Sequence, residues 1–407
     1  MTHIFPNRES IPGVAPGRPE RFYSLDALRG VAALSVVLWH WQHFFFIGTT
    51  PGSFDVERQP LYSIFWVFYH RGMLAVELFF ALSGFIFFWL YSERIASAAM
   101  NWWEFGVLRL SRLYPLHLAT LLIVAAGQWW FVSHTGSYFV YENNDAYHFG
   151  LNVLFANSWG LENGYSFNAP SWSVSVEMML YVMFFLVVSR GIARPPTLLL
   201  LALTGLALQS VHNGIADGIY AFFMGGLMYM AYAWISDRGL AAKLAVPLLG
   251  LCGVLWAAAL LELVSPYLAS GVTRVFATGT SSGSGAIHVF KEAFLTGLVM
   301  PSTILSLAVL ETAHGPLGRN LTWLGDVSYA SYLLHFPLQI AFAAVVISFG
   351  LNRDLFFQPL TLIAFFSLLL AVSAISHRWF ELPVRGIMRR KLGQHRSSRA
   401  LDPELAG

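Results

Sequence analysis

Three ionisable residues interrupt an apolar stretch near the beginning of the chain that is long enough to cross a lipid bilayer. The stretch SLDALRGVAALSVVLWH, residues 24–40, contains Asp26, Arg29 and His40. Ionisable side chains are costly in lipid and mark functional sites where they occur, so chemistry is to be sought here first. In a helix, Arg29 and His40 share one face and lie roughly 16 Å apart along the axis. This arrangement suits a protein that binds a charged molecule at one side of a membrane and performs acid/base chemistry nearer the other.

His40 is the first candidate for a general base, because an imidazole can accept a proton near neutral pH. The alternative is an interfacial histidine that is hydrogen-bonded to a backbone carbonyl. Glu77 lies in a second apolar stretch, 71–92, where a charged carboxylate needs a partner. Arg29 or His40 would supply that partner. The alternative for Glu77 is a structural ion pair between two helices.

Arg109 and Arg112 are three residues apart at the start of a third apolar stretch, so their guanidinium groups point the same way from one helix. Two planar guanidinium groups side by side suit phosphate groups. The alternative is anchoring to anionic lipid headgroups. Arg29 is expected near the same cytoplasmic side. The three arginines would then surround a cytoplasmic opening of the bundle and hold a polyphosphate such as the nucleotide end of coenzyme A.

A further acidic residue, Glu177, enters the membrane from the opposite side within the segment 168–181. It would bind an acceptor hydroxyl, orient His40, or hold the bundle together. His335 is the second candidate for catalysis. The residues expected to bind an acceptor or support the site are Trp172, Ser173, Tyr181, Tyr332 and His335.

The composition is that of a membrane protein. Of the 407 residues, 56% are hydrophobic and 11% are charged, and the mean hydropathy is +0.58. In a soluble globular domain, about a quarter of the residues are charged. The first 23 residues have no cleavable signal pattern, so we expect the first span to be retained. The lone Cys252 excludes an intrachain disulfide and a cysteine metal cluster, and no metal site is expected.

Ten apolar segments have spanning length. They lie at 24–47, 71–92, 107–132, 172–190, 196–212, 217–235, 242–264, 290–312, 325–349 and 356–380. With the N-terminus inside, 18 of the 24 Lys and Arg residues fall in cytoplasmic loops, as the positive-inside rule requires. The segment 133–171 has no Lys or Arg and is expected outside the cytoplasm. The sequence therefore predicts an all-α polytopic bundle of about ten transmembrane helices with both termini cytoplasmic.

Three regions follow from this topology. Residues 1–23 form a cytoplasmic N-terminal segment, 24–386 the transmembrane domain, and 387–407 a basic cytoplasmic tail. The tail has too little apolar content to fold alone. The Gly/Ser run 278–286 is interpreted as a flexible external linker.

The chain resembles the membrane acyltransferase-3 family. The resemblance is carried by segments in the family's order: 24–40, AVELFFALSGF (75–85), RLSRLYPLH (109–117), SWSVSVEMMLY (171–181), LGDVSYASYLLHFP (324–337) and FELP (380–383). Members move an acyl group, usually acetyl, from cytoplasmic acyl-CoA to hydroxyls of glycans and other small acceptors. The resemblance implies that Arg29 and His40 are essential for transfer and that Arg109 and Arg112 handle acyl-CoA. One departure is Glu77, where the family commonly has Asp.

The resulting hypothesis is an O-acyltransferase of the inner cell membrane, with acetyl-CoA as co-substrate. CoA phosphates would bind near Arg29, Arg109 and Arg112. His40, assisted by Glu77 or Glu177, would then deprotonate an acceptor hydroxyl that attacks the thioester. A covalent acyl-histidine relay is the alternative route.

The rival hypothesis for the whole protein is a transporter or flippase for a glycan or lipid-linked glycan. The expected partners are acyl-CoA, a carbohydrate or other hydroxyl acceptor, and the lipid bilayer, with no nucleic acid. A homo-oligomer or a glycan-synthesis partner is left open.

Overall fold

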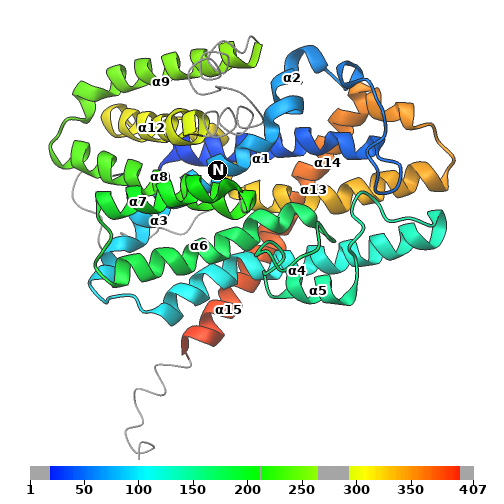
Figure 1. Cartoon of the computed structure of the whole chain (residues 1–407), viewed down its shortest axis with the longest axis horizontal. Coiled ribbons are helices and arrows are strands. Elements are labelled where there is room, and N and C mark those ends of the chain that lie inside the picture. Colours follow the sequence, from blue (N-terminus) through cyan, green and yellow to red (C-terminus); the bar gives the residue numbers. More distant parts are fainter. Residues whose placement is uncertain (1–18, 211, 265–292, 395–407) are drawn as a thin grey trace, which may run out of the picture. The chain divides into compact units, whose positions relative to one another are not determined.

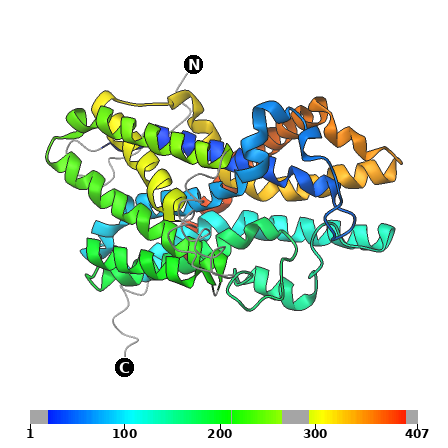
Figure 2. The same cartoon turned by 45° about the horizontal axis from the view of Figure 1, so that its top comes forward.

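The computed structural model describes residues 19–210, 212–264 and 293–394, and these residues form helices without a strand (Figures 1 and 2). The first half contains α1 (Tyr23–Trp39), η1 (His40–Phe45), η2 (Val56–Arg58), α2 (Tyr62–Arg71), η3 (Gly72–Leu74), α3 (Ala75–Ala96), α4 (Trp102–Thr135), α5 (Ala146–Val153), η4 (Ala169–Ser171) and α6 (Trp172–Ser189). The second half contains α7 (Pro195–Ala207), η5 (Leu208–Ser210), α8 (Asn213–Asp237), α9 (Ala241–Val264), η6 (Leu295–Val299), α12 (Met300–His314), η7 (Arg319–Leu321), α13 (Thr322–Ser348), η8 (Arg353–Phe357), α14 (Pro359–Ser376), η9 (His377–Glu381) and α15 (Leu382–Gln394). The predicted linker 278–286 lies outside the described residues.

Eight helical stretches in the described part of the chain are long and apolar enough to cross a membrane. They are Tyr62–Ala96, Trp102–Thr135, Ala169–Ser189, Asn213–Asp237, Ala241–Leu263, Leu295–His314, Arg319–Ser348 and Pro359–Leu392. The prediction of an all-α polytopic membrane protein is confirmed. The count is two below the ten expected, because α1 has 17 residues before it tightens into η1 and α7 has 13. The cytoplasmic location of the termini stays a prediction.

The chain divides into two compact units. Unit 1 comprises Met1–Leu28, Glu77–Ala99 and Met183–Thr322, and unit 2 comprises Arg29–Val76, Met100–Val182 and Trp323–Gly407. Glu77 belongs to unit 1, whereas the other predicted site residues belong to unit 2. Each unit is therefore described by itself.

Unit 1 is built on close helix packing around α8. A Cβ atom at Gly84 of α3 would collide with the backbone carbonyl of Phe222, and one at Gly225 of α8 would collide with that of Ala81. Glycine at both positions lets the two backbones touch, which is the main source of attraction between helices in lipid. Helix α12 packs against both α8 and α9.

The beginning of α1 is held in unit 1 by a buried carboxylate on α12. Glu311 is 3% exposed and accepts hydrogen bonds from the backbone N–H groups of Tyr23 and Ser24, both at 2.9 Å. The Ser24 hydroxyl donates to the same carboxylate at 2.5 Å. These groups are the otherwise unsatisfied donors of a helix N-terminus, where negative charge is favoured. Glu311 therefore sets where α1 begins.

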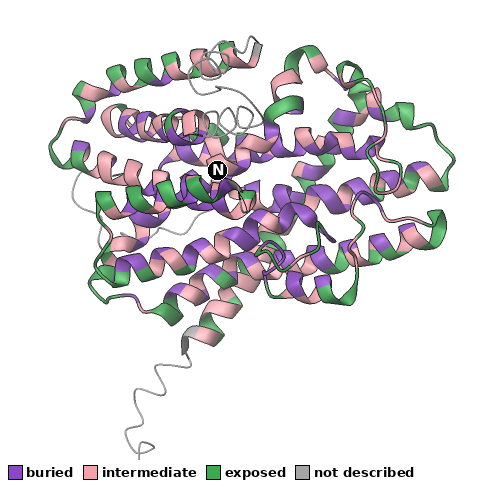
Figure 3. Cartoon of the chain, in the orientation of Figure 1, coloured by how far each residue is buried: buried purple, intermediate pink, exposed green. Residues whose placement is uncertain are grey.

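In unit 2, α13 is the central helix, and much of its surface is buried (Figure 3). One side of it meets α4 and the segment after it through a cluster that includes Leu121, Phe139 and Phe336. A second cluster joins η1, η8 and α14 around Trp41 and Phe365. These two clusters fix the positions of η1 and α4 relative to α13.

We predict that Glu311→Gln lowers the stability of the folded protein by about 1 kcal/mol, because the cap on α1 loses its charge. The measurement is the thermal unfolding midpoint of the purified protein in detergent. Glu93→Gln, at an exposed position of α3, is the control and should leave the midpoint unchanged. Equal midpoints for both variants would contradict the role given to Glu311.

Candidate active site

Arg29 is anchored to α13 within unit 2. Its Nη2 donates to the backbone carbonyl of Gly325 at 2.7 Å and its Nε donates to the Ser328 hydroxyl at 3.1 Å. The two helices are in close contact at Gly30: a Cβ atom added there would lie only 2.7 Å from the backbone carbonyl carbon of Leu324. The small residue beside Arg29 thus lets α1 and α13 approach closely enough for the guanidinium group to reach the neighbouring backbone.

His40 lies where α1 gives way to the 3-10 turn η1, and it is 2% exposed. Its Nδ1 lies 2.9 Å from the backbone carbonyl of Val36. A carbonyl can only accept, so Nδ1 carries the proton and Nε2 of the neutral ring carries the lone pair. The ring is therefore oriented with a basic nitrogen directed away from its own helix, as a general base requires.

Two further imidazoles lie against His40, and we call His40, His43 and His335 the histidine cluster. The ring centroid of His40 lies 4.8 Å from that of His43 and 4.9 Å from that of His335. His335 is fully buried, and its Nδ1 lies 2.6 Å from the backbone carbonyl of Tyr332. Its Nε2 has no hydrogen-bond partner among the described residues. His335 therefore presents a second buried lone pair next to His40.

Sequence reasoning missed His43 and Gln339. The Gln339 side chain is fully buried, and its Nε2 donates to the backbone carbonyl of His40 at 2.8 Å. Its Oε1 is then free to accept from Nδ1 of His43 at 3.1 Å. The spacing of three residues between His40 and His43 could have indicated that both imidazoles lie close together. A single sequence, however, does not show which residue of α13 forms hydrogen bonds to both residues.

The segment between α4 and α6 contacts the histidine cluster through Tyr141. The Tyr141 hydroxyl lies 3.4 Å from Nε2 of His43, and its ring lies 5.0 Å from that of Phe336. Helix α5 in this segment is capped by Asp145, which accepts hydrogen bonds from the backbone N–H of His148 at 2.9 Å and from its imidazole at 2.8 Å. These hydrogen bonds hold the pKa of Asp145 below its usual range.

The start of α6 contacts α13 through Ser173 and Tyr332. The Tyr332 hydroxyl donates to the backbone carbonyl of Pro170 at 2.6 Å, so the Ser173 hydroxyl donates to Tyr332 at 2.8 Å. Asn168 donates from Nδ2 to the backbone carbonyl of Leu333 at 3.0 Å. Three of the predicted supporting residues, Ser173, Tyr332 and His335, are thus brought together. Trp172 is half-buried at the first position of α6.

The predicted phosphate-binding residues share surroundings with Glu177. The Tyr181 hydroxyl is hydrogen-bonded to Glu177, and both Arg109 and Arg112 interact electrostatically with Tyr181. Arg29 and Arg112 both interact with His377 of η9. Through these shared electrostatic neighbours, Arg29, Arg109, Arg112 and Glu177 lie in one region of unit 2, which we call the arginine network. Glu77 lies in unit 1, and its pairing with Arg29 or His40 stays a prediction.

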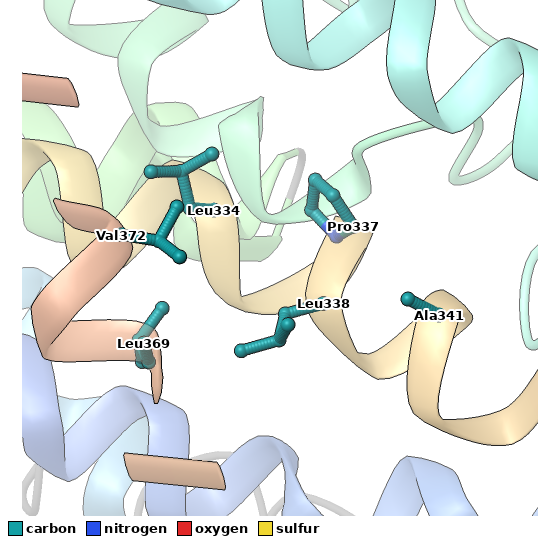
Figure 4. Close-up of a pocket in the computed structure, with 6 residues that line it drawn as sticks. All are labelled: Leu334, Pro337, Leu338, Ala341, Leu369 and Val372. Atoms are coloured by element: carbon teal, nitrogen blue, oxygen red, sulfur yellow. The ribbon is translucent and has the colours of Figure 1, made fainter. Parts of the chain in front are cut away.

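The described residues contain no group of three or more His, Cys, Asp or Glu side chains that could hold a metal ion. An apolar cavity of about 160 Å³ lies between α13 and α14 (Figure 4). It is lined by Leu334, Pro337, Leu338, Ala341, Leu369 and Val372. Because this lining is entirely hydrocarbon, the cavity offers no acid, base or hydrogen-bonding side chain for a reaction.

Comparisons with known proteins agree with the motifs. The family model described as "Acyltransferase domain", that of the acyltransferase-3 family, matches residues 22–378. The chain belongs to the acyltransferase-3 family. A segment of 108 residues is 38% identical to "Protein 2 in picA locus" of Rhizobium radiobacter, covering 26% of this chain and 46% of that protein. A segment of 177 residues is 33% identical to "Acyltransferase MdmB" of Streptomyces mycarofaciens, covering 42% of this chain and 40% of that protein.

The chain thus aligns with less than half the length of each of these curated relatives. No solved structure matches. The resemblance to the acyltransferase-3 family that was inferred from the motifs is confirmed. The matched region contains Arg29, His40, Arg109, Arg112 and the whole histidine cluster.

We predict that Gln339→Met destabilises the protein by about 1–3 kcal/mol, because it leaves the buried imidazole N–H of His43 without its acceptor. Thermal unfolding of the purified protein measures the change. Gln358→Met, at an exposed position before α14, is the matched control. The bridging role of Gln339 would be wrong if both variants unfolded at the same temperature.

Proposed function

We propose that this acyltransferase moves an acetyl group from cytoplasmic acetyl-CoA to a hydroxyl of a carbohydrate acceptor at the outer side of the inner cell membrane. The observation that carries the proposal is the 2.9 Å hydrogen bond from Nδ1 of His40 to the Val36 carbonyl, which leaves Nε2 as the ring nitrogen that can accept a proton. His40 shares unit 2 with the arginine network.

In the proposed reaction, Nε2 of His40 removes the proton from the acceptor hydroxyl as its oxygen attacks the thioester carbonyl. The tetrahedral adduct then breaks its bond to sulfur, and the CoA thiolate takes the proton back from His40. The products are the acetyl ester and CoA, and the base is restored. Glu177 and Glu77 are the carboxylates proposed to assist.

Buried acceptor atoms support a hydroxyl-rich substrate. Nε2 of His335 and Oδ1 of Asn168 are buried and have no donor among the described residues. The side chains that carry them are both tied to adjacent backbone carbonyls of α13, those of Tyr332 and Leu333. Buried acceptors without donors are costly, and hydroxyl groups of a bound ligand would satisfy them. A sugar supplies several such hydroxyls beside the one that is acylated.

The donor would bind from the opposite direction. Arg109 and Arg112, with Arg29, are proposed to hold the CoA phosphates, because guanidinium groups match phosphate oxygens in geometry and charge. The pantetheine arm would then extend over the roughly 16 Å between the levels of Arg29 and His40.

We expect His40→Ala to lower acetyl transfer at least 100-fold, the usual contribution of a general base, while acetyl-CoA still binds. The O-acetyl content of surface glycans is measured in a deletion strain that expresses the variant. His134→Ala, an exposed histidine at the end of α4, is the control and should restore wild-type acetylation. Full acetylation by His40→Ala would defeat the assignment.

Replacing Arg109 and Arg112 together by Ala should raise the KM for acetyl-CoA at least tenfold, because two charged hydrogen-bond donors are lost. The measurement is CoA release by purified protein at varied acetyl-CoA. Arg112→Lys keeps the charge and loses the planar geometry, so its KM should be intermediate. A glycan transporter would release no CoA in this assay, and wild-type protein that releases none would overturn the proposed function.

A further inference from the structure

We infer that the phosphate-binding surface for acyl-CoA extends from α4 onto α15, where Arg385 and Arg389 complete it. The inference rests on the proposed function and adds two binding residues to it. The sequence interpretation divided the transmembrane domain from a tail at residue 387. In the structure, α15 runs from Leu382 to Gln394, across that boundary.

Helix α15 packs along the first part of α4 (Figure 1). Nε of Arg389 donates to the Ser111 hydroxyl at 3.3 Å. The Trp103 indole N–H donates to the backbone carbonyl of Leu392 at 3.1 Å. Ser111 lies between Arg109 and Arg112 in the sequence of α4, so Arg389 contacts α4 within one helical turn of both arginines.

Arg385 lies one helical turn before Arg389 and therefore on the same face of α15. It interacts electrostatically with His377 and with Glu381. Arg112 interacts with the same two side chains. Arg389 is thus linked to α4 by a hydrogen bond, and Arg385 shares two electrostatic neighbours with Arg112.

These shared neighbours bring together side chains of both charges. The arginines are Arg29, Arg109, Arg112, Arg385 and Arg389, and the carboxylates are Glu177, Asp326 and Glu381. Like charges on one helix face and on a facing helix repel each other. A ligand with several phosphate groups would relieve this repulsion, and the nucleotide end of acyl-CoA is such a ligand.

The position of α15 along the membrane normal suits a water-soluble ligand. The helical run Pro359–Leu392 has 34 residues, as does α4. Each is about 51 Å long, whereas the hydrocarbon core of a bilayer is about 30 Å thick. Helix α15 forms the last part of its run, next to the exposed Trp102 and Trp103 that are typical of the membrane interface. Arg385 and Arg389, both half-buried, are therefore expected at headgroup level, where a nucleotide can reach them.

The test measures acetyl-CoA binding to the full-length protein by calorimetry in discs of zwitterionic phosphatidylcholine, without an acceptor. Arg385→Gln and Arg389→Gln should each weaken binding about tenfold, the effect of losing one charged donor to a phosphate. Arg390→Gln is the matched control, since Arg390 is the exposed neighbour of Arg389 on the same helix. It should change the affinity less than about twofold.

Arg109→Gln separates failure of this inference from failure of the proposed function. If Arg109→Gln weakens binding and the two α15 variants do not, the extension onto α15 is wrong and the donor site stands. If wild-type protein binds no acetyl-CoA, both are wrong. A phosphate from a lipid headgroup has the same chemistry, so thermal unfolding is compared in discs with and without phosphatidylglycerol. Stabilisation by this lipid that Arg389→Gln abolishes, with unchanged acetyl-CoA affinity, would assign α15 to lipid and overturn the inference.

Discussion

The contact between α1 and α13 is the interaction on which the candidate site depends. Arg29 and His40 are costly in an apolar helix unless neighbouring groups satisfy them. Helix α13 does so at two levels: Gly325 and Ser328 bind the Arg29 guanidinium, while Gln339 binds the backbone of His40. The glycine at position 30 permits the approach. Loss of this contact would remove the hydrogen-bond partners of the Arg29 guanidinium on α13. It would also remove the Gln339 hydrogen bond that holds the backbone at His40, the proposed base.

The polar side chains of unit 2 form two groups with different chemistry. The Nδ1 atoms of the histidine cluster all lie within hydrogen-bonding distance of acceptors; Nε2 of His43 faces the Tyr141 hydroxyl, and Nε2 of His335 has no partner among the described residues. The second group is an arginine network balanced in part by Glu177 and its neighbours. The proposed proton transfer and the proposed phosphate binding thus involve two separate groups of side chains.

Much of the architecture could be predicted from hydrophobicity, because a bilayer demands long apolar helices whatever their neighbours are. The exceptions have physical causes. The span 24–47 is not one regular helix, since α1 tightens into a 3-10 turn at His40. The polar composition of α15 did not by itself indicate that this helix packs against another. It is held against α4 by a hydrogen bond from Arg389 to Ser111 and one from Trp103 to the Leu392 carbonyl.

The long apolar segments of the sequence by themselves determined the class of protein, and the motifs in their order determined the family. They also made Arg29 and His40 candidates, because ionisable residues are rare in membrane-spanning segments. Only the tertiary structure decided which groups surround them: His43 and His335 beside the base, Gln339 between two imidazole-bearing turns, and α15 beside the arginines. Side-chain neighbours on different helices depend on how backbones approach one another, as at Gly30 and Leu324, and no periodicity along one helix specifies that approach.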